Sequence, residues 1–239
     1  MSSCLEQITS GEKKFGLLID PDSYTRESLI KSVDNANKSG VHFILIGGSL
    51  VTNKVDSYIE IIKERSNIPV LLFPGSLLQL SDKADALLFI SLLSGRNPEF
   101  LVGNHVIAAP FIKSRGIECI PTAYILIEGG VVSSVEYMSN TKPIPRNKTD
   151  IIIATAIAGE LMGNKLIYLE CGSGAKEPLS ADIVKEVCKN VSIPVIVGGG
   201  LHTPGQIKDI LVAGAKMVIV GNALENNNIN IHELVRSVK

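Results

Sequence analysis

The chain has 239 residues, a formal net charge of −1 and a hydrophobic fraction of 45%, values typical of a globular protein with a large core. The absence of a basic tail and of an aromatic–arginine pattern argues against nucleic acid as a partner. The longest apolar stretches, near residues 86–93 and 151–158, fall far short of the roughly 20 residues of a membrane-spanning helix. We therefore expect a cytoplasmic protein without a transmembrane segment, which leaves room for contact with a membrane surface.

The cysteines and histidines do not suggest a metal site. None of them stands at the spacing of a metal-binding motif, so we expect reduced thiols and structural or surface imidazoles. These residues are Cys4, Cys119, Cys171, Cys188, His42, His105, His202 and His232.

Strand-like and helix-like segments alternate along the chain. Short apolar runs typical of buried strands occupy residues 16–20, 42–46, 69–73, 86–90, 118–127, 166–170, 194–197 and 217–220. Helical spacing or capping signals occupy residues 25–39, 54–66, 98–113, 149–163, 180–189, the segment from 203 onward, and 229–238. Eight such units in this length favour a closed barrel of parallel strands over an open sheet.

Two segments depart from a regular repeat of strand and helix. Only about a dozen residues separate the third strand from the fourth, too few for a full helix with two loops. Residues 128–148, rich in glycine and proline, are typical of an inserted loop. The sequence therefore predicts a single domain over residues 1–239, a TIM (β/α)8 barrel whose third outer helix is shortened or missing.

Glycine-rich turns follow the last strands. In such barrels the active site lies at the carboxyl ends of the strands, and the loops after strands seven and eight commonly bind phosphate. Glycine lets the backbone approach a ligand and present its N–H groups. Gly199 and Gly200 follow the seventh strand, and Gly221 and Asn222 follow the eighth, so we expect these four residues to bind a phosphate group.

The sixth strand ends in two polar side chains that face the same way. Tyr168 and Glu170 are two residues apart, so both should point into the barrel near its mouth. A buried carboxylate is costly unless it has a partner or a function, which makes Glu170 a candidate catalytic group; pairing with a lysine at the rim is the alternative. Ser173 and the glycines beside it offer further donors for a phosphate, and Cys171 should point outward and pack.

Hard oxygen ligands stand at the first two strand ends. Asp20 ends the first strand and Ser49 follows the second, a pairing that suits Mg²⁺, which takes one or two protein oxygens plus substrate phosphates. Asp22 is a second candidate ligand. The alternative is structural, because Asp-Pro-Asp is also a common turn and helix-start sequence.

Leucines crowd residues 73–93. Leu77, Leu78, Leu80, Leu92 and Leu93 lie in or beside the loops after the third and fourth strands. Active-site loops for polar metabolites are seldom so apolar, and a groove for a long hydrocarbon would explain this composition. Packing of a satellite core is the equally weighted alternative.

Taken together, these motifs resemble the geranylgeranylglyceryl phosphate synthase family from about residue 20 to residue 222. The resemblance rests on Asp20-Pro21-Asp22, Gly47-Gly48-Ser49, Ser94-Gly95-Arg96-Asn97-Pro98, Pro121-Thr122-Ala123-Tyr124, Tyr168-Leu169-Glu170, Gly172-Ser173-Gly174, Gly198-Gly199-Gly200 and Gly221-Asn222. The element at 168–174 is the most specific of these. The resemblance implies a modified TIM barrel that joins sn-glycerol 1-phosphate to geranylgeranyl diphosphate through an ether bond and requires Mg²⁺. It also implies a homo-oligomer, a dimer or a hexamer.

The resemblance assigns roles by position. Asp20 and Ser49 would hold the metal that binds the diphosphate. The glycerol phosphate would be bound by Tyr168, Leu169, Glu170, Cys171, Gly172, Ser173, Gly174, Gly199, Gly200, Gly221 and Asn222, with Glu170 and Tyr168 as the catalytic residues. The chain departs from the family at Leu18, where many members have lysine, and this removes one phosphate contact. Whether Asp22 or Arg96 joins the site is left open.

Two other functions fit a phosphate-binding barrel. One is an isomerase, as in histidine or tryptophan biosynthesis, which needs a pair of acid–base groups at opposite strand ends. Asp20 lacks an equivalent aspartate, since the fifth strand leads into Glu128. The other is a non-catalytic protein that binds a prenyl lipid or a phosphorylated metabolite, for which Asp20 and Glu170 would be dispensable.

Overall fold

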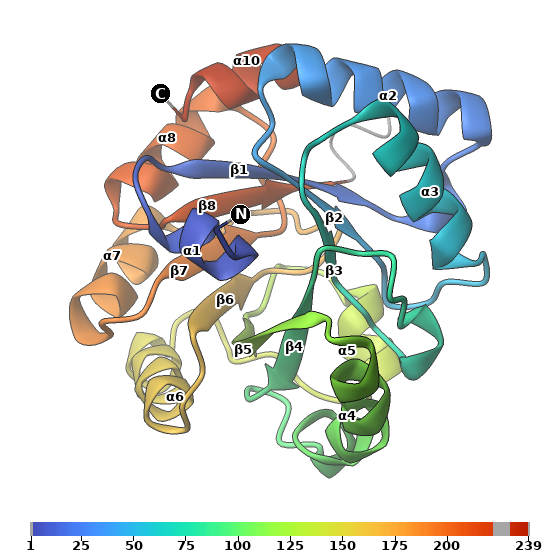
Figure 1. Ribbon diagram of the computed structural model, residues 1–239. Helices are drawn as coiled ribbons and strands as arrows, with labels where there is room; N and C mark the ends of the chain where they lie inside the picture. Colours follow the sequence, from blue (N-terminus) through green and yellow to red (C-terminus); the bar gives the residue numbers. More distant parts are fainter. Residues whose placement is uncertain (1, 222–229, 239) are drawn as a thin grey trace.

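The computed structural model describes residues 2–221 and 230–238, and the strands within them form a closed parallel barrel (Figure 1). Each strand pairs with the next in the chain, and the last pairs with the first. The strands are β1 (Lys14–Ile19), β2 (Phe43–Ile46), β3 (Val70–Leu72), β4 (Ala86–Leu92), β5 (Glu118–Leu126), β6 (Leu166–Glu170), β7 (Val195–Gly198) and β8 (Met217–Val220). The TIM barrel predicted from the sequence is confirmed, and the division into a single domain over 1–239 stays a prediction.

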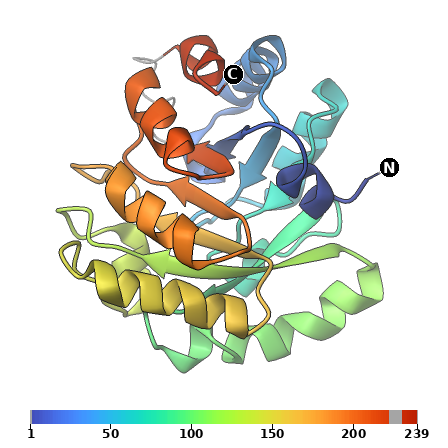
Figure 2. The same cartoon turned by 90° about the vertical axis from the view of Figure 1, so that its left-hand side faces the viewer.

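Helices surround the barrel on its outside (Figures 1 and 2). They are α2 (Arg26–Ser39), α3 (Val55–Arg65), α4 (Gly103–Arg115), α6 (Thr149–Leu161), α7 (Ala181–Asn190), α8 (Pro204–Val212) and α10 (Ile231–Arg236). Short 3₁₀ turns occupy η1 (Pro21–Ser23), η2 (Leu77–Gln79) and η3 (Pro98–Phe100). The fully described segment between β3 and β4 contains η2 and no α-helix, so the expectation of a reduced third outer helix is correct. Among the described residues, no helix is both long and apolar enough to cross a bilayer.

Alternate residues of each strand belong to two different hydrophobic layers. In β6, Leu166 and Tyr168 point into the barrel, while Ile167 and Leu169 pack between the barrel and the helices. Both faces of the sheet are therefore buried, which explains why the strands are apolar along their whole length. The same alternation directs Glu170 toward the interior at the carboxyl end of the strand.

A short helix that the sequence analysis did not predict closes the amino-terminal end of the barrel. Helix α1 (Cys4–Thr9) begins with a capping box between Ser3 and Glu6, and the N–H groups of Cys4 and Leu5 donate to the Glu118 carboxylate at 2.7 and 2.9 Å. Its Ile8 is fully buried in the interior cluster of the barrel. Figure 2 shows α1 on the opposite side of the barrel from the yellow-green loop of residues 128–148.

The inserted segment 128–148 lies at the other end, as expected for a loop after β5. It contains helix α5 (Ser134–Ser139), and a bridge between Ile127 and Ile144 ties it back to the strand end. This position places α5 over the mouth of the barrel, where the candidate site lies.

The burial of Ile8 makes α1 a contributor to stability that is remote from the mouth. We expect Ile8→Ala to lower the free energy of unfolding by about 2–4 kcal/mol, because it leaves a cavity in the barrel interior. The matched control is Ile107→Ala on α4, where the side chain is 64% exposed and the change should stay within about 0.5 kcal/mol. Urea unfolding of both variants measures the difference; equal effects would show that α1 does not plug the barrel.

Candidate active site

A polar cavity of about 560 Å³ opens at the carboxyl ends of the strands. Most of the site residues predicted from the sequence line it together. They are Asp20, Ser49, Tyr168, Glu170, Gly172, Ser173, Gly174, Gly199, Gly200 and Gly221. Asn222 lies outside the described residues, so its part in phosphate binding stays a prediction. The volume suits a small-molecule ligand.

Glu170 provides the carboxylate of the polar cavity. Its side chain is 7% exposed, and its Oε1 atom accepts a hydrogen bond of 2.7 Å from the N–H of Gly172. The alternative raised by the sequence was a lysine partner at the rim, but among the described residues no salt bridge involves Glu170. Burial raises the pKa of Glu170 to about 7, against the lowering by the Gly172 N–H. A carboxyl group with this pKa can accept a proton near neutral pH.

Tyr168 lies beside Glu170 at the floor of the polar cavity. Its ring packs against Phe73 and Tyr124, with centroids 5.3 and 5.1 Å away. Its buried hydroxyl lines the cavity next to the Glu170 carboxylate and lowers the pKa of Glu170, although the two groups do not meet with full hydrogen-bond geometry. A ligand in the polar cavity therefore meets the Tyr168 hydroxyl and the Glu170 carboxylate side by side.

Glycines are required where the chain passes the Glu170 carboxylate. A Cβ on Gly198 would lie 2.4 Å from the Tyr168 hydroxyl oxygen and 2.6 Å from Glu170 Oε2. A Cβ on Gly199 would lie 2.2 Å from Glu170 Oε1, and Gly199 and Gly200 have φ angles of +80° and +70°. The glycines therefore let the β7 loop pack directly on the carboxylate while its backbone lines the cavity.

Asp20 and Ser49 lie at the opposite wall of the polar cavity. A Cβ on Gly48 would lie 2.7 Å from Asp20 Oδ2, which shows that the carboxylate rests on the 47–49 backbone. Burial raises the pKa of Asp20, partly offset by the hydrogen bond from the Asp22 N–H to its Oδ1. One carboxylate and one hydroxyl open to a cavity fit Mg²⁺ that completes its shell with substrate phosphate and water. Within residues 2–221 and 230–238 no group of three or more metal-binding side chains gathers, so an all-protein metal cage is not part of this site.

Asp22, the second metal candidate, is engaged elsewhere. Its carboxylate accepts hydrogen bonds of 2.8–3.0 Å from the backbone and side chains of Thr52 and Asn53. These bonds lower the pKa of Asp22 and hold the loop after β2. Asp22 therefore positions a loop, and neither it nor Arg96 lines the polar cavity.

Leu169 and Cys171, predicted as binding residues, have side chains on the outer face of β6 and beyond it. Both belong to the layer between barrel and helices, and neither lines the cavity, so their predicted part in binding is not supported by the geometry. Burial and the Glu170 charge raise the pKa of Cys171 to about 11, which fits packing rather than nucleophilic attack. The Arg146 guanidinium, 3.8 Å from its sulfur, also bonds to Glu177 and Pro178 and thereby fastens the inserted loop to the β6 loop.

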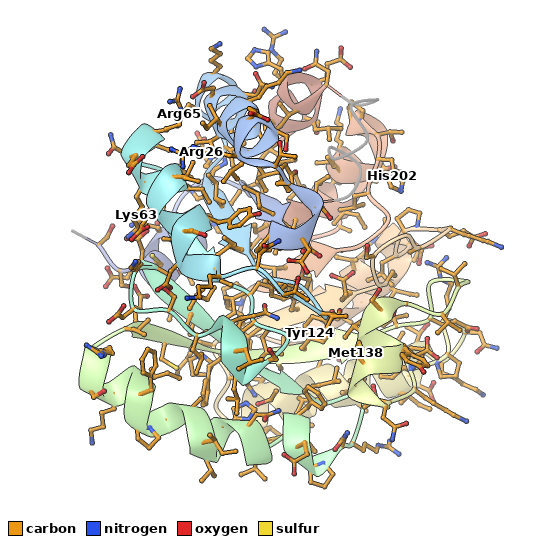
Figure 3. All side chains as sticks on the ribbon, turned by 90° about the vertical axis from the view of Figure 1, so that its right-hand side faces the viewer. Arg26, Lys63, Arg65, Tyr124, Met138 and His202 are labelled. Atoms are coloured by element: carbon orange, nitrogen blue, oxygen red, sulfur yellow. The ribbon has the colours of Figure 1, made fainter. Side chains whose placement is uncertain are left out.

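An apolar groove of about 630 Å³ adjoins the polar cavity. Its walls come from β4, β5, α4, α5 and the loop after β3. Two of its lining residues, Tyr124 of β5 and Met138 of α5, are labelled in Figure 3. Of the leucines in the leucine-rich segment, Leu77, Leu78, Leu80 and Leu92 line the groove, as predicted. The alternative holds in part, because Leu93 lies outside the groove and packs on the core, as Leu77 and Leu80 also do. Leu78 is 91% exposed, and such a side chain is costly in water unless something covers it.

The groove and the cavity share part of their lining. The shared residues are Gly48, Ser49, Leu50, Phe73, Tyr124 and Val135. A single ligand with a polar head and a long apolar tail could therefore bind across the two. Phe73 was missed as a site residue, although its place at the end of the third strand, two residues after inward-facing Leu71, was a usable signal. Val135 lies in the inserted loop, where the sequence offers no periodic pattern.

Comparisons with known proteins agree with one another. The PcrB family model matches residues 7–238. The geranylgeranylglyceryl phosphate synthase of Chitinophaga pinensis is 42% identical, covering 99% of this chain and 94% of its own, and that of Pyrococcus abyssi is 39% identical, covering 98% and 92%. The crystal structure of (S)-3-O-geranylgeranylglyceryl phosphate synthase from Thermoplasma acidophilum in complex with substrate sn-glycerol 1-phosphate superposes with a TM-score of 0.94 at 34% identity, covering 100% of this chain and 99% of that one.

A more distant likeness shows the fold alone. The N-acetylmannosamine-6-phosphate 2-epimerase from Clostridium perfringens has a TM-score of 0.60 at 17% identity, covering 93% of this chain and 91% of that one.

The buried Glu170 should make stability depend on pH. Because its pKa in the folded protein is near 7 and its ordinary value is 4.5, the folded state holds a proton that the unfolded state releases between these values. The free energy of unfolding therefore falls as the pH rises through this window. We expect Glu170→Gln, which keeps an acceptor for Gly172, to be more stable than the parent at pH 8 by on the order of 3 kcal/mol, and equal to it at pH 4.5.

Urea unfolding of both proteins at the two pH values checks this expectation. The difference between the proteins removes the titration of all other groups. A Glu170→Gln variant that is less stable than the parent at pH 8 would contradict the assignment of Glu170 as an unpaired buried charge.

Proposed function

This chain belongs to the PcrB family, and we propose that it is a geranylgeranylglyceryl phosphate synthase, a prenyltransferase that joins sn-glycerol 1-phosphate to geranylgeranyl diphosphate through an ether bond. The observation that carries the proposal is a polar cavity, which holds a buried carboxylate, that shares six of its lining residues with an apolar groove. One substrate of this reaction is small and anionic, and the other has an anionic head and a long hydrocarbon tail. The two connected spaces match these two chemistries.

The glycerol phosphate binds at the β6–β8 side of the polar cavity. Gly172, Gly199 and Gly200 bring backbone close to the ligand, and Ser173 adds a hydroxyl. The relative from Thermoplasma acidophilum contains sn-glycerol 1-phosphate within the same fold, which supports this ligand here. The Tyr168 hydroxyl at the floor, beside the Glu170 carboxylate, then binds a glycerol hydroxyl.

The prenyl diphosphate binds from the opposite wall. Its diphosphate lies toward Asp20 and Ser49, and its hydrocarbon chain follows the groove walled by Leu77 and Leu80. His105 lines this groove with its ring edge-on to Phe89, and burial lowers the pKa of His105, so a neutral imidazole faces the hydrocarbon. The groove therefore buries apolar surface without placing a charge beside it.

Proton transfer by Glu170 fits the pKa and the position of its carboxylate. The terminal hydroxyl oxygen of glycerol phosphate attacks the allylic carbon C1 and forms the new C–O bond. The bond between C1 and the diphosphate oxygen breaks, and its electron pair leaves with the diphosphate. The hydroxyl proton passes to Glu170, which acts as general base, while the cavity holds the two substrates in line.

Mg²⁺ fits the wall formed by Asp20 and Ser49. A bound Mg²⁺ would neutralise charge on the leaving diphosphate. The Asp20 carboxylate and the Ser49 hydroxyl would supply the protein ligands, since both line the cavity on the side from which the diphosphate would leave. The homo-oligomeric state and the cytoplasmic location expected from the sequence stay predictions.

The two rival functions receive no specific support. An isomerase of a polar phosphorylated metabolite has no use for a leucine-lined apolar groove with Leu78 exposed at its edge. The likeness to an epimerase at 17% identity shows the barrel and nothing of the chemistry. A non-catalytic binding protein would need neither the buried Glu170 nor its raised pKa.

The proposal is tested by a product assay. The protein is mixed with Mg²⁺, radiolabelled sn-glycerol 1-phosphate and geranylgeranyl diphosphate, and the mixture is extracted into organic solvent. We expect label in the organic phase, because the ether product carries a C20 hydrocarbon chain. The label should be absent with EDTA and with sn-glycerol 3-phosphate, whose hydroxyl would be held with the wrong stereochemistry. A failure of transfer with every prenyl diphosphate from C10 to C35 would refute the synthase function and leave the binding protein as the alternative.

A further inference from the structure

The 3₁₀ turn that replaces the missing outer helix carries a buried amide between the two cavities. Gln79 ends η2 and is 1% exposed, although its neighbours Leu78 and Leu80 face the apolar groove. Its side chain points inward, behind the walls, and lines neither cavity. A buried amide is retained only where its hydrogen bonds are satisfied, so its partners indicate its purpose.

All the partners of Gln79 are backbone groups of the two loops that border the diphosphate end. The N–H groups of Gly48 and Gly75 donate to its Oε1 atom at 3.2 and 3.3 Å, and its Nε2 atom donates to the Gly48 carbonyl at 2.7 Å. The amide orientation is unambiguous, because the flipped amide would place its NH₂ against two N–H donors. One side chain thus joins the loop after β2 to the loop after β3.

The two loops touch so closely that glycine is needed at their contacts. A Cβ on Gly75 would lie 2.3 Å from the Gly48 carbonyl oxygen, and a Cβ on Gly47 would lie 2.1 Å from the Phe73 carbonyl oxygen. Gly48 in turn lies against the Asp20 carboxylate, and Ser49 follows it directly. A shift of Gly48 therefore displaces the Asp20 and Ser49 wall of the polar cavity.

We propose that Gln79 is a positioning residue that holds Gly48 and Gly75 and thereby sets the diphosphate-binding wall of Asp20 and Ser49. The inference rests on the proposed synthase function, because it assigns the diphosphate to that wall. Gln79 is placed between the two loops because η2, the only element between β3 and β4 in that fully described segment, stands where a regular barrel has an outer helix. Its loss removes the partner of two N–H groups and one carbonyl in this partly buried contact, which loosens the wall and leaves the β6–β8 side unchanged.

The test measures binding of two probes by isothermal titration calorimetry, inorganic diphosphate with Mg²⁺ and sn-glycerol 1-phosphate. Gln79→Met keeps the length of the side chain and removes its hydrogen bonds. We expect it to weaken diphosphate binding about tenfold or more and to change glycerol phosphate binding less than about twofold, a split that a general loss of structure does not produce.

The matched control is Asn164→Leu at the other end of the barrel. Asn164 is also a buried amide, and its Nδ2 atom donates to the Gly159 carbonyl at 2.8 Å. This variant should lose thermal stability and bind both probes as the parent does. Equal loss of diphosphate binding in Asn164→Leu and Gln79→Met would overturn the inference.

Gln79→Glu makes the diphosphate binding depend on pH in a way that tests the same role. It also replaces Gln79→Met as the test variant if Gln79→Met fails to fold. A protonated glutamic acid offers one acceptor and one donor, as the amide does, whereas the carboxylate cannot donate to the Gly48 carbonyl. We expect diphosphate binding near that of the parent at pH 5.5 and about tenfold weaker at pH 8.5. If the ratio of the diphosphate dissociation constants of Gln79→Glu and the parent does not change with pH, the positioning role is contradicted.

The two proposals fail in different ways. A parent protein that binds neither probe would refute the proposed function itself. Parent binding of diphosphate that Gln79→Met leaves unchanged would refute this inference alone.

Discussion

The site depends on one carboxylate that is kept out of water. Glu170 is the last residue of β6 and faces the barrel interior, where its side chain is 7% exposed. Its carboxylate accepts a hydrogen bond from the Gly172 N–H. Because burial favours the neutral form, its pKa rises to about 7, where it can take up a proton and release it again. A carboxylate at the surface would stay ionised and would be a weak base.

In the part of the chain that the structure describes, this carboxylate is held without a salt bridge. Gly198 and Gly199 pass so close to Glu170 and Tyr168 that any side chain there would collide with them. Gly199 also lines the cavity, so the same turn both buries the carboxylate and borders the space where we propose that phosphate binds. A salt bridge would also have stabilised the Glu170 carboxylate. It would, however, have lowered the pKa of Glu170, so that the group could no longer take up a proton near neutral pH.

The missing outer helix has a comparable double consequence. Without it, the leucines after β3 form the wall of a groove that a regular barrel would cover, and the groove reaches the polar cavity through Ser49, Phe73 and Tyr124. In the 3₁₀ turn that stands there instead, the Gln79 amide bonds to the backbone of Gly48 after β2 and of Gly75 after β3. Reduction of the barrel at one place thus supplies space for a hydrocarbon.

Periodic features were predictable from the sequence, and individual contacts were not. The apolar runs predicted the barrel, the short spacer predicted the reduced helix, and the spacing of Tyr168 and Glu170 predicted that both point inward. The role of Asp22 was not predictable, because an aspartate that ligates a metal and one that caps Thr52 and Asn53 look the same in a sequence. Helix α1 was missed because its six residues are too few for a periodic pattern. Its Ser3–Glu6 capping box was a usable local signal, whereas the Glu118 carboxylate that accepts from the N–H groups of Cys4 and Leu5 lies more than a hundred residues away.

The role of the buried carboxylate is tested most directly by the pH dependence of kcat/KM for sn-glycerol 1-phosphate. The parent enzyme should show a rise that levels off above an inflection near pH 7, in addition to the titration of the substrate phosphate near pH 6. Glu170→Gln should be slower by about a hundredfold or more and retain only the inflection of the substrate. A Glu170→Gln variant with a rate near that of the parent, or with the inflection near pH 7 intact, would show that the proton goes elsewhere.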